Sequence, residues 1–130
     1  MELLGAISTI RGILRYIWTS PSNKGSRLRH VANGIAWQAW KRTVGLPIVL
    51  TLDNGRRYFA HPRSGNSVGA IYCRIYEAEY ILFLREHICR DEEAVLLDVG
   101  AHTGLVTLLL ADAFRQGACF EPAPDTFGIL

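Results

Sequence analysis

The sequence has little of what marks a disordered, disulfide-bonded or membrane-spanning chain. It contains five prolines and three cysteines in 130 residues, and hydrophobic residues make up 49%. This composition excludes a disordered or collagen-like chain and predicts one domain of about 100 to 150 residues. The cysteines form no CxxC pair, so they indicate neither a disulfide framework nor a zinc site and fit a reducing cytoplasm. No uncharged run is long enough to span a membrane.

Acidic residues are scarce in the first third of the chain. Residues 1–45 carry seven Lys or Arg against the single acid Glu2, whereas residues 46–130 carry seven Arg against eleven acids. A basic arm could bind phosphates or anionic lipid, but a solvated helical face explains the same split. The two parts are predicted to be a basic helical N-terminal extension (1–45) and an incomplete Rossmann-like domain (46–130).

Two helices are predicted in the extension. Leu3, Ile7, Ile10, Leu14 and Ile17 recur at helical spacing, and a breaker cluster at 19–24 ends that helix. The second helix is expected to begin after Ser26 as its N-cap. Its expected apolar face consists of Leu28, Val31, Ala32, Ile35, Ala39 and Trp40. Gly34 is expected to weaken the helix. Glu2, Arg11 and Arg15 argue against a secretory signal. Weak contact of residues 1–19 with a membrane surface is an alternative, although docking on the protein's own core is commoner.

The middle of the chain predicts a β-hairpin and a third helix. Residues 48–52 and 57–59 are rich in strand formers and flank an Asp-Asn-Gly turn at 53–55. Residues 64–69 are rich in Ser and Gly and predict a loop. After it, Tyr76, Tyr80, Phe83, Leu84 and Ile88 form a helical stripe.

The last 37 residues predict a strand, a glycine loop, a helix and a second strand. The expected ranges are 94–99, 100–104, 105–114 and 118–121, with Gly117 as the helix C-cap and a further helix starting at 122–126. The run 94–97 does not alternate, as expected for a strand buried on both faces of a parallel sheet. The predicted fold class is therefore α/β, the start of a Rossmann-like sheet preceded by two helices and a hairpin.

The candidate chemistry lies in the glycine loop. Gly100 and Gly104 follow the strand at the edge where open α/β sheets bind ligands. Glu121 follows Asp98 by 23 residues, at the end of the next strand, where an acid can accept both hydroxyls of a ribose. His102 occupies the place of the middle glycine of GxGxxG, which argues against a nicotinamide or flavin site, and no P-loop motif is present. The GxxxG spacing suits a ligand with an amino-acid tail, S-adenosyl-L-methionine.

These residues resemble the FkbM-type methyltransferases. That family's loop Asp-Val-Gly-Ala-Asn-x-Gly matches Asp98 to Gly104, and its Phe-Glu-Pro matches residues 120–122. The resemblance covers about residues 46–130, more loosely over the hairpin and the third helix. It implies transfer of a methyl group from S-adenosyl-L-methionine to a hydroxyl of a sugar or other small-molecule acceptor. Any general base is expected beyond Leu130.

The same resemblance implies roles for the candidate residues. Gly100, Ala101 and Gly104 would line the methionine and adenosine moieties, Asp98 would support the loop or meet the methionine amino group, and Glu121 would hold the ribose. His102 stands where Asn is usual. An imidazole donates or accepts one hydrogen bond where an amide does both, so a loop contact is expected to differ. No metal site is expected, since the spacing of His30, His61 and His87 fits none.

Two expectations concern completeness and alternatives. Rossmann-like methyltransferases need further strands, so the chain is expected to be a fragment that is inactive or weak alone, with one sheet face and edge uncovered. The first alternative is a nucleotide-binding module without catalysis. The second is a basic element in residues 1–45 acting on anionic lipid or nucleic acid, although no nucleic-acid partner is expected.

Overall fold

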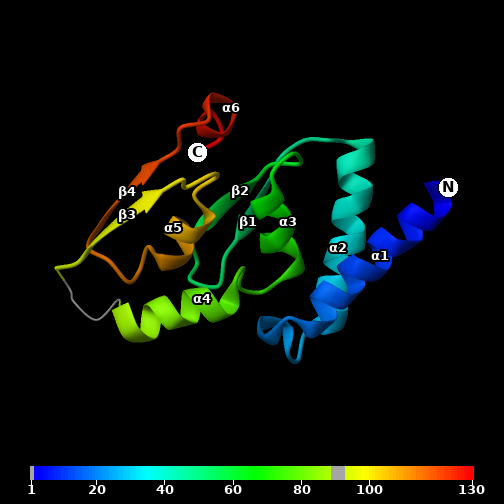
Figure 1. The fold of residues 1–130 in the computed structure, drawn as a ribbon, viewed down its shortest axis with the longest axis horizontal. Helices are drawn as coiled ribbons and strands as arrows, with labels where there is room; N and C mark the ends of the chain where they lie inside the picture. Colours follow the sequence, from blue (N-terminus) through cyan, green and yellow to red (C-terminus); the bar gives the residue numbers. More distant parts are fainter. Residues whose placement is uncertain (1, 89–92) are drawn as a thin grey trace.

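The computed structural model describes residues 2–88 and 93–130, with side chains from Ile10 onward. It is a mixed α/β protein with two separate two-stranded sheets (Figure 1). The elements are α1 (Glu2–Thr19), the 3-10 turn η1 (Pro21–Asn23), α2 (Arg27–Thr43), β1 (Ile48–Thr51), β2 (Arg57–Ala60), α3 (Gly65–Tyr72), α4 (Ala78–Phe83), the π-helical turn η2 (Leu84–Ile88), β3 (Val95–Val99), α5 (Leu105–Leu110), β4 (Gln116–Phe120) and α6 (Pro124–Phe127).

The two predicted N-terminal helices are confirmed, but the predicted buried face of α2 is largely wrong, although its Val31 packs against the core. Leu28, Ile35 and Trp40 are exposed. The helix instead buries Gly34 and Trp37. A Cβ at Gly34 would lie 3.1 Å from Ile17 Cδ1 and 3.3 Å from Tyr72 Cε1, so the missing side chain is what allows this close approach. Ser26 is the N-cap residue as predicted, although its side chain makes no capping hydrogen bond.

In α1, the predicted stripe is partly wrong. Ile17 is buried and Ile13 packs against the core, while Ile10 and Leu14 are exposed. The side chains of Leu3 and Ile7 lie outside the described residues, as does Cys89. The side of α1 that contacts the core therefore includes Ile13, one residue before the predicted Leu14.

A buried asparagine joins the first turn region to α3. The Asn23 side chain has no exposed surface, and its Nδ2 donates to the carbonyl oxygens of Ile17 at 2.9 Å and Tyr72 at 2.8 Å. Its Oδ1 accepts from the backbone N–H of Arg74 at 2.9 Å. One side chain therefore satisfies three backbone groups from two distant segments, a role that the predicted turn at 19–24 did not reveal.

The predicted loop at 64–69 is wrong, because most of it belongs to α3. The Ser64 side chain accepts from the backbone N–H of Ser67 at 3.4 Å and caps the helix. A Cβ at Gly69 would lie only 2.1 Å from Cδ2 of Tyr76, so the ring of Tyr76 rests on the glycine. The small residues that suggested a loop are thus mostly helical, and Gly69 among them admits a neighbouring ring at short range.

The predicted third helix is present as α4 followed by η2, but its predicted stripe is partly wrong: Tyr76 and Leu84 pack against the core, and the other residues do not. Tyr80, Phe83 and Ile88 are exposed, and the buried residues are Ala78 and Ile81. Glu77 has φ of +46°, a left-handed conformation that separates Tyr76 from α4. The helix therefore begins after the first residue of the predicted stripe and presents a different face.

The hairpin and the C-terminal strands are confirmed. β1 pairs antiparallel with β2 from Ile48↔Ala60 to Thr51↔Arg57, and β3 pairs parallel with β4 from Val95↔Gln116 to Val99↔Phe120. α5 connects β3 to β4, and α6 follows as predicted. α5 ends at Leu110 rather than at 114, and Gly117 lies within β4 rather than at a helix cap.

The expectation that β3 is buried on both faces is wrong. Leu97 is 64% exposed and Val99 is 81% exposed, together with Val95 and with Phe120 of β4. α5 packs on the other side of the strand, where Leu96 contacts the core. One face of the pair is therefore exposed and has no cover from the residues that the structure describes. The core cluster itself combines Ile17 and Trp37 of the basic extension with Tyr58 and Leu105 of the following part.

We predict that Asn23→Ala lowers the free energy of unfolding by about 2 to 3 kcal/mol, because it leaves buried backbone groups without partners. Urea denaturation followed by circular dichroism measures the change. Asn33→Ala is the matched control, since Asn33 is exposed on α2, and it should change stability by less than about 0.5 kcal/mol. Equal effects of the two substitutions would contradict the role of Asn23.

Candidate functional site

The glycine loop joins the end of β3 to the start of α5 in a strongly curved conformation. Gly100, His102 and Gly104 have φ of +84°, +54° and +69°. The backbone N–H groups of Gly100 and Ala101 both donate to the carbonyl oxygen of Phe120, at 2.7 and 3.1 Å. The loop is thereby held across the carboxyl end of β4, at the edge of the sheet where the sequence had placed it.

The conformation of His102 gives a physical reason for the residue type at this position. Positive φ is uncommon outside glycine, and Asn, Asp and His are the residues enriched there. The imidazole Nδ1 lies 3.4 Å from the hydroxyl of Thr103. His102 therefore adopts a backbone geometry that asparagine also tolerates, even though the hydrogen-bonding capacities of the two side chains differ.

Glu121 ties the loop to the segment that leads into α6. One carboxylate oxygen accepts from the backbone N–H of His102 at 2.8 Å, and the other accepts from the N–H of Ala123 at 2.9 Å. Each oxygen of an ionised carboxylate has a further lone pair. Glu121 is therefore both a structural acceptor for the loop and a half-buried carboxylate with remaining hydrogen-bonding capacity.

Asp98 lies apart from this carboxylate. Its Oδ2 accepts from the hydroxyl of Thr107, in the first turn of α5, and the same hydroxyl lies 3.1 Å from Sγ of Cys119. Asp98 thus fixes α5 against β3. The structure brings Gly100, Ala101, His102, Gly104 and Glu121 together at the sheet edge, and directs the Asp98 side chain toward the helix.

A buried hydroxyl chain supports the loop from behind, which sequence reasoning missed. Tyr58 in β2 shares hydrogen bonds with the hydroxyls of Thr103 at 2.7 Å and Ser67 at 3.2 Å. Both partners are buried. The period-two pattern of β2 shows that Tyr58 and Ala60 face the same side, but it carries no sign of a partner 45 residues away.

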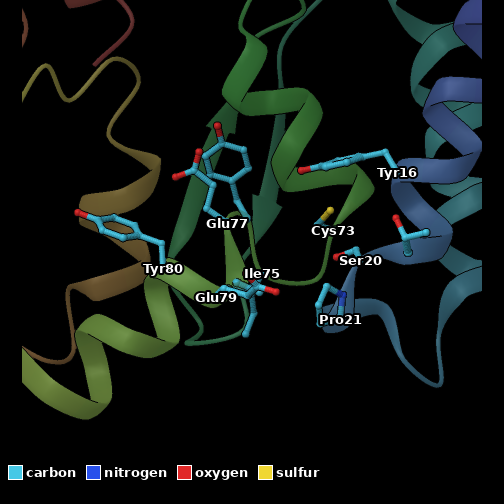
Figure 2. Close-up of a pocket in the computed structure, with 11 residues that line it drawn as sticks. Tyr16, Ser20, Pro21, Cys73, Ile75, Glu77, Glu79 and Tyr80 are labelled. Carbon is cyan, nitrogen blue, oxygen red and sulfur yellow. The ribbon is translucent and has the colours of Figure 1, made fainter.

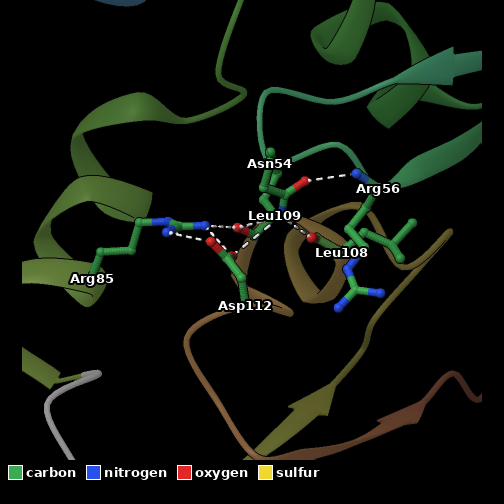
Figure 3. Close-up of polar contacts among 6 residues, drawn as sticks. All are labelled: Asn54, Arg56, Arg85, Leu108, Leu109 and Asp112. Carbon is green, nitrogen blue, oxygen red and sulfur yellow. Dashed lines mark hydrogen bonds and ion pairs between the residues drawn. The ribbon is translucent and has the colours of Figure 1, made fainter.

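The other end of α5 is also fixed by side chains from distant segments (Figure 3). Asn54, in the hairpin turn, donates to the carbonyl oxygen of Leu108 at 2.7 Å. Arg85, in η2, donates to the carbonyl oxygen of Leu109 and pairs with Asp112. These contacts satisfy carbonyl groups that a helix end leaves without partners. They also lower the pKa of the Asp112 carboxyl, chiefly through the Arg85 hydrogen bond.

The segment after α6 covers part of the loop. A Cβ at Gly104 would lie 2.8 Å from Cδ1 of Leu130. Figure 1 shows α6 beyond the ends of β3 and β4, on the side of the glycine loop. Leu130 therefore occupies the space that the missing side chain of Gly104 leaves open.

Comparison of the chain with protein-family models, curated proteins and solved structures found no match. Within the part of the chain that the structure describes, no three His, Cys, Asp or Glu residues are grouped to hold a metal ion. The described helices include none with the length and apolar character needed to cross a bilayer. The family assignment and the cofactor thus remain predictions.

We predict that Glu121→Ala lowers the free energy of unfolding by about 1 to 3 kcal/mol, because two charge-assisted acceptors of backbone N–H groups are lost. Asp125→Ala, at an exposed acid in α6, is the control and should have little effect. Urea denaturation of both variants provides the measurement. A Glu121→Ala protein as stable as the control would show that the loop does not depend on this carboxylate.

We also predict a specific acid sensitivity from Asp112. Because the folded state lowers its pKa below the ordinary 3.8, the ionised carboxylate stabilises the fold above that pH, and this stabilisation is lost as the pH falls through the folded pKa. The stability difference between the wild type and Asp112→Asn should therefore be constant near neutral pH and shrink below about pH 3.8. Thermal melts from pH 6 to pH 2 test this, and a pH-independent difference would refute it.

Proposed function

We propose that this chain forms the cofactor-binding part of an S-adenosyl-L-methionine-dependent methyltransferase that acts on a hydroxyl group. The observation that carries the proposal is the position of Glu121. It directly follows β4, the strand beside β3, and its carboxylate contacts the backbone of the GxxxG loop at His102. A glycine loop and a carboxylate at adjacent carboxyl ends of parallel strands suit a ligand that has an amino-acid tail and a ribose.

The loop residues fit such a ligand. A Cβ at Gly100 would meet no atom within 4 Å, so the loop backbone is approachable there. Gly104 precedes the free N–H groups of the first turn of α5, where a carboxylate is favourably placed. In this proposal Gly100, Ala101 and Gly104 line the amino-acid and adenosine parts, while Asp98 acts indirectly by holding α5 through Thr107.

Glu121 would serve the ligand with the capacity that the backbone leaves free. Ribose hydroxyl groups donate, and each Glu121 oxygen already accepts a single N–H. His102 contacts Glu121 through its backbone N–H, and its ring lies beside the Thr103 hydroxyl. Leu130 would have to leave the space next to Gly104, which requires a movement of the short segment after α6.

When bound, the cofactor supplies an electrophilic methyl group for a hydroxyl of a sugar or other small-molecule acceptor. The chain's own contribution is to position the cofactor, and alignment of the acceptor with the methyl group is the larger part of such catalysis. The β3–α5–β4 unit would then be the start of a Rossmann-like sheet. A cytoplasmic location is part of the same proposal.

We predict saturable binding of S-adenosylhomocysteine to the 130-residue chain. A hundredfold excess over the dissociation constant should stabilise the fold by about 2.7 kcal/mol. The analogue with a deoxyribose should bind more weakly, since it lacks a hydroxyl group that would donate a hydrogen bond to Glu121. In Glu121→Gln the two ligands should differ less, because the amide cannot accept on both sides. Calorimetry and thermal shift measure both effects.

The comparison of two ligands in two proteins separates recognition from stability, because Glu121→Gln also weakens the loop. Asp125→Gln is the control and should preserve the preference for the ribose ligand. Binding of ATP or NAD in place of S-adenosylhomocysteine would favour a nucleotide-binding module of another kind. A folded chain that binds S-adenosylhomocysteine without distinguishing the deoxyribose analogue would overturn the role of Glu121, and no binding at all would overturn the proposal for this chain.

A further inference from the structure

A cavity of about 560 Å³ lies where the end of α1 and η1 face the turn between α3 and α4 (Figure 2). Aromatic rings and carboxylates dominate its functional groups, and the residues concerned are Tyr16, Tyr76, Tyr80, Glu77 and Glu79. Among the described residues that line the cavity there is no Lys or Arg. None of the lining residues belongs to the candidate site at the glycine loop, so the cavity needs an explanation of its own.

Polar groups from both walls line the cavity. Figure 2 shows the ring of Tyr16 extending from α1 toward the turn that carries Glu77, with Cys73 close to the Tyr16 hydroxyl. Burial is the main cause that raises the pKa of Tyr16, and the neighbouring Cys73, Tyr76 and Glu77 raise this pKa further. Burial and then the Glu77 carboxylate raise the pKa of Tyr76. Two phenol rings from different elements therefore share one space with a carboxylate.

The chain backbone fixes part of this arrangement. The ring of Tyr76 rests on Gly69 of α3, where any side chain would collide with it. Glu77 follows directly, in the left-handed conformation that ends the turn before α4. Tyr16 comes from the opposite wall and is 45% exposed, so the cavity remains open to solvent. A small ligand could enter without unfolding either wall.

We propose that this cavity binds a small organic ammonium ion. The faces of tyrosine rings attract cations, most strongly where water is partly excluded. Glu77 and Glu79 add negative charge to the same lining, and no described lining residue offsets it. An anionic ligand would be repelled by these carboxylates, and a neutral one would lack the charge attraction that an ammonium ion has to them. The proposal does not depend on the function assigned to the glycine loop.

Choline is the probe, and its neutral carbon isostere, with a tert-butyl group in place of the trimethylammonium group, is the matched ligand control. Calorimetry should show saturable choline binding, with the isostere at least about tenfold weaker. In proton NMR, the N-methyl signal of choline should move upfield on binding because it lies over aromatic rings. Signals of Tyr16 and Tyr76 rings should shift together along the titration.

Variants of one residue separate the ring from its hydroxyl. Tyr16→Phe keeps the ring and should retain choline affinity within about twofold, whereas Tyr16→Leu should weaken it about fivefold to thirtyfold. Glu77→Gln should weaken it by a similar factor. Glu93→Gln removes the same charge from an exposed residue outside the cavity and should leave affinity unchanged. Circular dichroism melts verify that each variant is folded. Because Tyr16 is partly exposed, we expect its substitutions to leave the fold intact.

Equal affinity for choline and its neutral isostere would overturn the proposal. An unchanged affinity in Tyr16→Leu would overturn it too, because the ring would then not contribute to choline binding. An equal loss of affinity in Glu77→Gln and Glu93→Gln would show that the local charge of the cavity is not the cause of binding. Absence of choline binding by the folded wild type would overturn it as well. None of these results bears on S-adenosylhomocysteine binding, which involves different residues.

Discussion

The parallel pairing of β3 with β4 is the constraint on which the candidate site depends. It places Val99 beside Phe120. The next residue after each of them, Gly100 and Glu121, belongs to the candidate site. The carbonyl oxygen of Phe120 accepts two N–H groups of the loop, and Glu121 accepts a third from His102. Without that register the glycine loop and the carboxylate would have no common edge. The site is therefore a product of backbone pairing first and of side chains second.

A pair of parallel strands needs support from other elements, since two-stranded sheets are marginal in water. That support comes through α5, which buries Leu105, Leu109 and Leu110 in the core. Its last turn is fixed by Asn54 and Arg85, and the loop before its first turn is fixed by Tyr58 through Thr103. The hairpin and η2 thus act on the site without being part of it.

The sequence predicts the elements of this fold better than their faces. The hairpin, the β3–α5–β4 unit and the glycine loop follow from local signals such as Asp-Asn-Gly and the strand-loop-helix pattern at 94–110. The buried face of α2 does not, because the decisive residue is Gly34, which periodicity counts as a defect. Gly69 is a second glycine of this kind. The sequence predicts a loop there, but the residue belongs to α3 and leaves room for the ring of Tyr76.

The site residues show the same limit for a different reason. Gly100, Gly104 and Glu121 could be selected from spacing, because strand ends in one sheet must converge. The contacts of Tyr58 with Thr103 and Ser67, and of Asn23 with Tyr72, join residues 9 to 49 positions apart and carry no periodic signal. Such contacts arise only once the helices are packed. They nevertheless decide the geometry, because a buried hydroxyl or amide without its partner costs more than its pairing contributes. The local pattern therefore predicts where the candidate site lies, and the long-range polar contacts hold that region in shape.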